Sequence, residues 1–119
     1  MALKNIVKPY HLLVDGDMSG SLLTNLVDVS YTDNVGIQLN FTGTPVGTFA
    51  VEGSIDYDDH LSTGNWSSLT FSSTPSAAGA ADVHLLNLNQ LPYKKIRVRY
   101  TRSSGSGTLN VYVMAKGLN

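Results

Sequence analysis

An acidic cluster near the middle of the chain combines residue types and spacing that suggest chemistry. Asp56, Asp58 and Asp59 precede His60 in the stretch DYDDHLSTG. Carboxylate oxygens at alternating loop positions are ligands that Ca²⁺ accepts, so the cluster is a candidate calcium site. It lacks the spacing, the glycine and the final glutamate of an EF-hand, and aspartates also favour turns because their side chains accept hydrogen bonds from nearby amides. The turn is the favoured interpretation and calcium the alternative.

The histidines and serines form no catalytic motif. His11, His60 and His84 are far apart in the sequence, and no serine lies in a nucleophile elbow. The glycine-rich SSGSG stretch lacks the lysine and serine or threonine that complete a phosphate-binding loop. The chain has no cysteine, which excludes disulfides and thiolate metal sites. We therefore predict a protein that is not an enzyme and has no cofactor.

Two aromatic residues flank the acidic cluster. Tyr57 and Trp66 form a candidate glycan platform, because sugars stack on aromatic rings while aspartate and asparagine side chains supply hydrogen bonds. The alternative is that Trp66, the single tryptophan, fills the hydrophobic core. The core position is the favoured interpretation.

Cations alternate along one segment near the C-terminus. Lys95, Arg97 and Arg99, here called the cationic row, alternate with apolar residues, and Arg102 follows them. The row is a candidate for binding nucleic-acid phosphate, for pairing with acids on a neighbouring strand, or for docking on another subunit. The net charge of −1 and the scarcity of interleaved aromatic residues disfavour nucleic acid, so no specific nucleic-acid partner is predicted.

Opposite charges are separated along the sequence. Every lysine and arginine lies in the first eight residues or from Lys94 onward, and all nine acids lie between these segments. The two groups either mix in space, as distant strands of a sandwich often do, or form two unlike faces suited to docking. The sequence leaves both outcomes open.

Alternating apolar residues predict strands that would position these side chains. Residues 94–116 are predicted as a β-hairpin, with two alternating strands joined by SSGSG. Further strands are predicted at 10–14, 22–31 with a bulge near Asn25, 35–42, 48–56 and 83–88, whereas 72–81 is predicted as a loop.

Turn signals separate these strands about every dozen residues, and no amphipathic helix intervenes. At 119 residues the chain is one domain. We predict an all-β fold, a single-domain antiparallel β-sandwich of the jelly-roll type with about eight strands over residues 10–119, preceded by an extended N-terminal arm at 1–9. The absence of a long apolar run and of a signal-peptide pattern predicts no membrane partner, no secretion by a signal peptide and folding in the cytoplasm.

Three stretches carry a family resemblance: VGIQLNFTGTPVGTFAVEGSIDY at 35–57, GNWSSLTF at 64–71 and LNQLPYKKIRVRYTRSSGSGTLNVYVMAKG at 88–117. They resemble a group of small proteins encoded by tailed bacteriophages and prophages. The resemblance covers most of the chain after the first twenty residues, and its motifs are structural. More distantly, the tryptophan-bearing loop and the IRVRY strand are similar to discoidin-like sugar-binding sandwiches, although the disulfide-linked ends of those domains are missing here.

The resemblance implies a virion component made in the host cytoplasm. By analogy it would be a capsid decoration (cement) protein that bridges coat subunits, with a tail or baseplate protein and a carbohydrate-binding module as alternatives. The implied partners are a major capsid protein or other virion proteins, and a homo-oligomer is expected. The expected contact residues are Lys4, Ile6, Val7, Lys8 and Tyr10 in the arm, together with Lys95, Arg97, Arg99 and Arg102.

Overall fold

The computed structural model describes residues 5–29, 34–69, 75–89 and 93–118, and for 5–10, 89 and 116–118 it describes the backbone only. These residues form ten strands: β1 Asn5–Asp17, β2 Leu22–Leu23, β3 Val27–Asp28, β4 Asn34–Gly43, β5 Val46–Ser54, β6 Ser67–Ser68, β7 Ser76–Ala78, β8 Asp82–Asn89, β9 Lys95–Ser104 and β10 Gly107–Leu118. Within these ranges no helix has the length and apolar character needed to cross a membrane.

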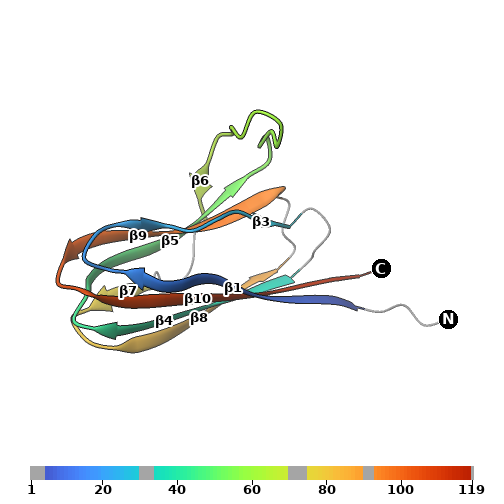
Figure 1. Cartoon of the computed structure of the whole chain (residues 1–119). Coiled ribbons are helices and arrows are strands. Elements are labelled where there is room, and N and C mark those ends of the chain that lie inside the picture. Colours follow the sequence, from blue (N-terminus) through green and yellow to red (C-terminus); the bar gives the residue numbers. More distant parts are fainter. Residues whose placement is uncertain (1–4, 30–33, 70–74, 90–92, 119) are drawn as a thin grey trace.

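The strands form two antiparallel sheets packed face to face (Figure 1). The four-stranded sheet has the order β1-β10-β4-β8, and the six-stranded sheet has the order β2-β9-β5-β6, with β3 also beside β9 and β7 also beside β5. β2 and β3 both pair with β9, and β6 and β7 both pair with β5. Each of these two pairs is therefore one interrupted strand. The eight strands that result follow the jelly-roll order, which confirms the predicted fold class.

The predicted hairpin at 94–116 is wrong, although both of its strands exist. β9 pairs with β2, β3 and β5, whereas β10 pairs with β1 and β4, so the two consecutive strands belong to opposite sheets. The apolar faces of β9 and β10 therefore face each other across the core, and both are buried. Gly105, in the connection between them, has a φ of +74°. A Cβ at this position would also overlap the Thr44 carbonyl oxygen, so the connection requires glycine.

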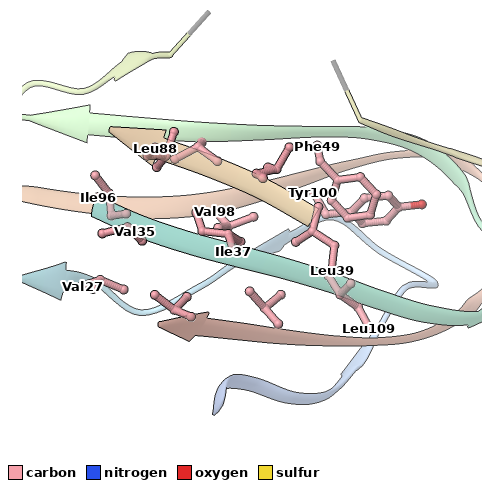
Figure 2. Packing of buried hydrophobic residues seen from close by; sticks show 14 of the residues in the cluster. Val27, Val35, Ile37, Leu39, Phe49, Leu88, Ile96, Val98, Tyr100 and Leu109 are labelled. Carbon is pink, nitrogen blue, oxygen red and sulfur yellow. The ribbon is translucent and has the colours of Figure 1, made fainter. Parts of the chain in front are cut away.

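Alternate side chains of the long strands fill the space between the sheets (Figure 2). Ile37, Leu39 and Val111 from the four-stranded sheet are fully buried, and Phe49 and Tyr100 pack against them from the six-stranded sheet. The rings of Phe49 and Tyr100 lie 5.0 Å apart and are tilted by 38°. The period-two pattern therefore predicted correctly which faces of β4, β5, β9 and β10 point inward.

The interruption between β2 and β3 is a bulge, as predicted near Asn25. Leu23 pairs with Arg99 and Val27 with Ile96, so this segment has one residue more than its partner strand. Thr24 bridges the gap, because its N–H donates to the Val98 carbonyl oxygen at 3.0 Å and its hydroxyl accepts from the Val98 N–H at 2.9 Å. The N–H and C=O groups of Val98, which regular strand pairing would satisfy, are satisfied here by Thr24.

Two segments differ from the predicted boundaries. β7 lies within the predicted loop 72–81, because small residues pack closely there and Ala77 is 3 % exposed beside β5. The part of the predicted arm that the structure describes, residues 5–9, is extended and belongs to β1, where it pairs with residues 114–118 of β10. Residues 1–4 lie outside the described part of the chain.

Candidate functional site

The outer face of the six-stranded sheet carries a charged cluster formed by Glu52, Arg97 and Arg99. Glu52 on β5 lies directly opposite Arg97 on β9. Arg97 Nε donates to Glu52 Oε1 at 2.7 Å, and Arg99 Nε donates to Glu52 Oε2 at 3.0 Å. The Glu52 and Arg97 side chains are only 13 % and 17 % exposed, whereas Arg99 is 42 % exposed, so one carboxylate holds one largely buried and one partly exposed guanidinium group.

Burial acts to raise the pKa of Glu52, but the hydrogen bonds and charges of Arg99 and Arg97 outweigh it, and the pKa lies below its ordinary value. The carboxylate is therefore ionised at neutral pH. One positive charge of the cluster remains uncompensated by Glu52.

Trp66 lies on this outer face and not in the core, so the favoured interpretation of this residue is wrong. Ser68 of β6 pairs with the outward-facing Glu52, and Trp66, two residues earlier, shares its side of the sheet. The Arg97 guanidinium carbon lies 4.1 Å from the Trp66 ring centroid, a cation–π contact. Tyr57 contacts the same tryptophan, with ring centroids 5.9 Å apart. The structure thus brings the predicted aromatic pair together, but Arg97 covers one face of the Trp66 ring.

The acidic cluster lies on the loop that projects from the sandwich between β5 and β6 (Figure 1). Asp58 Oδ1 accepts hydrogen bonds from the backbone N–H groups of His60 at 2.8 Å and Leu61 at 3.2 Å. The Asp58 N–H donates to the Thr63 carbonyl oxygen at 2.7 Å and closes the loop. Asp58 therefore stabilises a turn, as favoured from the sequence.

The other two carboxylates have separate partners. Asp56 Oδ1 accepts from the Asn65 N–H at 2.9 Å, and the Asn65 backbone and side-chain hydrogen bonds lower the Asp56 pKa. Asp59 lies 3.3 Å from Lys95 Nζ and 3.4 Å from Lys94 Nζ, and the hydrogen bond from Lys95 is the main cause of its lowered pKa. Among the described residues no three acidic, histidine or cysteine side chains converge on a possible metal position.

The separated charges of the sequence mix in space along the cationic row. Lys95 also lies 3.5 Å from Asp28, in addition to the pairing of both arginines with Glu52. Cross-strand pairing with acids, one of the alternatives predicted for the cationic row, is confirmed. Arg102 is exposed, and its Nε donates to the Gly105 carbonyl oxygen at 2.8 Å. The side chains of the predicted arm contacts Lys4, Ile6, Val7, Lys8 and Tyr10 lie outside the described part of the structure.

The structure shows a second candidate surface, a groove that the sequence analysis did not predict. The outer face of the four-stranded sheet contains a groove of about 790 Å³ along β4, lined in part by Gln38, Leu85 and Tyr112. The alternation of Gly36, Gln38 and Asn40 on β4 was available as a signal, but only the pairing of β4 with β8 and β10 brings these residues beside the other lining residues.

Comparisons with known proteins identify a fold and no family. No family model matches the sequence, and no curated protein is similar to it. A chain in the structure of infectious bursal disease virus Gx strain is similar in fold, with a TM-score of 0.53 and 12 % identity. The match covers 96 % of the present chain and 32 % of the viral chain, so the present chain corresponds to about a third of its structural neighbour.

Proposed function

We propose that this protein is a virion structural protein that decorates a capsid by bridging neighbouring coat subunits. The observation that carries the proposal is the jelly roll itself, whose likeness to a chain of a virus structure covers 96 % of the present chain. The resemblance of residues 35–57 and 88–117 to small proteins of tailed phages supports a phage particle as its location.

A cement protein acts by forming interfaces, and the fold offers a suitable edge. β1 is the longest strand at 13 residues and the outermost strand of its sheet. No strand of the described part of the chain pairs with its other edge, which presents backbone N–H and C=O groups that could pair with a strand of a coat subunit. Pro9 lies on this strand, a position that an edge tolerates because proline has no N–H to donate.

Cryo-electron microscopy of the intact particle tests the proposal. Density for the sandwich across the seams between coat subunits, with β1 against the coat, is the expected result. Density at the tail or baseplate would contradict the decoration role and support the alternative tail-associated role. The symmetry of the density would also show whether copies of the chain contact each other.

Binding to purified capsids lacking the protein provides a second test. Removing residues 1–4 leaves β1 whole, whereas removing 1–9 would also delete part of that strand, so the shorter deletion tests the first four residues of the predicted arm separately from β1. We expect saturable binding of the full chain and at least several-fold weaker binding of the shortened chain at an unchanged melting temperature. Equal binding by both chains would exclude residues 1–4 from the interface.

A further inference from the structure

We propose that the groove on the outer face of the four-stranded sheet, here called the sheet groove, binds a neutral oligosaccharide. This inference goes beyond the proposed structural role, because it concerns an activity of the isolated chain. It also assigns glycan binding to a surface on the opposite sheet from Tyr57 and Trp66.

Residues of all four strands of this sheet line the sheet groove, with His11 of β1 beside Tyr112. β4 lies between β10 and β8, and Gly36, Gln38 and Asn40 of β4 form the floor. A Cβ on Gly36 would meet no atom within 4 Å, so the space above this glycine is open. Tyr112 on β10 and Leu85 on β8 flank Gln38 in register and form the two walls. The volume of about 790 Å³ is that of a small-ligand site.

One wall is an ordered aromatic platform. Tyr112 stacks on His11 of β1, with ring centroids 4.3 Å apart and an interplanar angle of 16°. His11 Nε2 lies 2.9 Å from Asn110 Oδ1, which also accepts the Asp15 N–H at 3.0 Å. His11 and Tyr112 both line the sheet groove, and Tyr112 is 39 % exposed, so we take the ring face of Tyr112 that His11 leaves uncovered to border the groove. This face is available to stack on a sugar ring at little entropic cost.

The floor supplies hydrogen-bonding groups without charge. Gln38 Nε2 donates to Asn40 Oδ1 at 3.0 Å, which orients both amides. Gln38 Oε1 and Asn40 Nδ2 have no partner among the described residues, so one acceptor and one donor remain available. Among the described side chains, His11 is the one titratable group that lines the sheet groove beside Tyr112, and no aspartate, glutamate, lysine or arginine lines it. Uncharged amides beside an aromatic face match the hydroxyl groups and the apolar C–H faces of a neutral sugar, and they supply no countercharge for an ionic ligand.

Isothermal titration calorimetry with the full chain tests the proposal, using neutral oligosaccharides of glucose, mannose, galactose and N-acetylglucosamine as probes. We expect at least one to bind. Tyr112→Ala should weaken this binding at least tenfold, whereas Tyr112→Phe should retain most of it because the ring is kept. Absence of binding at millimolar concentrations of every probe would overturn the proposal.

A blocking variant makes the test independent of folding defects. Gly36→Leu should fill the sheet groove and abolish binding without lowering the melting temperature, because its Cβ lies in open space and glycine is unfavourable inside a strand. Gly20→Leu is the matched control, since a Cβ there also meets no atom within 4 Å and the residue lies outside the groove. Binding that survives Gly36→Leu but is lost in Trp66→Ala would overturn the proposal in favour of the aromatic pair on the other sheet.

A second copy of the chain is the competing occupant, because Leu85 and Met114 are 64 % and 51 % exposed on this face. Sedimentation equilibrium of the free chain and of Leu85→Asp distinguishes the two. A dimer that Leu85→Asp dissociates would overturn the proposal, whereas a monomer that binds sugar supports it. Neither result depends on whether the chain binds capsids, so the two proposals can fail separately.

Discussion

Glu52 and Arg97 face each other across β5 and β9, and their side chains form an ion pair of 2.7 Å in which both are largely buried. The two residues are 45 positions apart, and each comes from a part of the sequence with mainly one sign of charge. Arg97 also lies over the Trp66 ring, so the pair joins the sheet to the base of the projecting loop.

Replacing Glu52 should reveal how strongly this cluster stabilises the fold. Glu52→Gln leaves Arg97 and Arg99 without their carboxylate partner, and we expect the free energy of unfolding to fall by about 1–3 kcal/mol. Urea denaturation at pH 7 measures the change. Asp82→Asn is the control, because its carboxylate is 60 % exposed and a change of less than about 0.5 kcal/mol is expected. Equal effects of the two substitutions would show that burial does not strengthen the Glu52 pairs.

The same carboxylate predicts a dependence of stability on pH. The folded-state pKa of Glu52 is lowered from its ordinary value of 4.5, so its contribution is fully present above that pH and is lost as the pH falls through the folded pKa. The wild-type chain should therefore lose stability below about pH 4.5, and Glu52→Gln should lose less. Melting temperatures between pH 7 and pH 3 measure this. A stability difference between the two chains that stays constant down to pH 3 would contradict the assignment.

Tyr100 has a buried hydroxyl without a hydrogen-bond partner among the described residues. Burial raises the pKa of this phenol, and the side chain is 1 % exposed. Tyr100→Phe removes the unsatisfied group and keeps the ring against Phe49, so we expect an unchanged or increased free energy of unfolding, by up to about 1 kcal/mol. Thermal denaturation measures it. A loss of more than 1 kcal/mol would indicate that the hydroxyl has a partner, such as a buried water.

Trp66→Ala tests the placement of the tryptophan outside the core. The half-buried ring contacts Arg97 and Tyr57, so we expect a loss of less than about 2 kcal/mol. Phe49→Ala, which removes a ring that is 2 % exposed, should cost about 3–5 kcal/mol and is the matched comparison. Similar losses of unfolding free energy in the two variants would indicate that Trp66 lies in the core.

The sequence by itself determined the class of fold and the inward faces of β4, β5, β9 and β10. Alternation of Ile37 and Leu39 with Gln38 and Asn40 has only one arrangement that buries the apolar side chains, because the side-chain period of a strand is two. The bulge near Asn25 was predictable for the same reason, since the apolar pattern changes phase there.

Tertiary structure decided which strands pair and therefore which side chains meet. A turn-like SSGSG predicts a reversal of the chain but does not tell whether the next strand joins the same sheet or the opposite one. The jelly roll places β9 and β10 in different sheets, and this arrangement places Arg97 beside Glu52 and Tyr112 beside His11. The position of Trp66 also depends on this pairing, because only the register of β6 against β5 directs its ring outward. Local patterns determine which way a side chain points, whereas its neighbours depend on contacts between segments far apart in the chain.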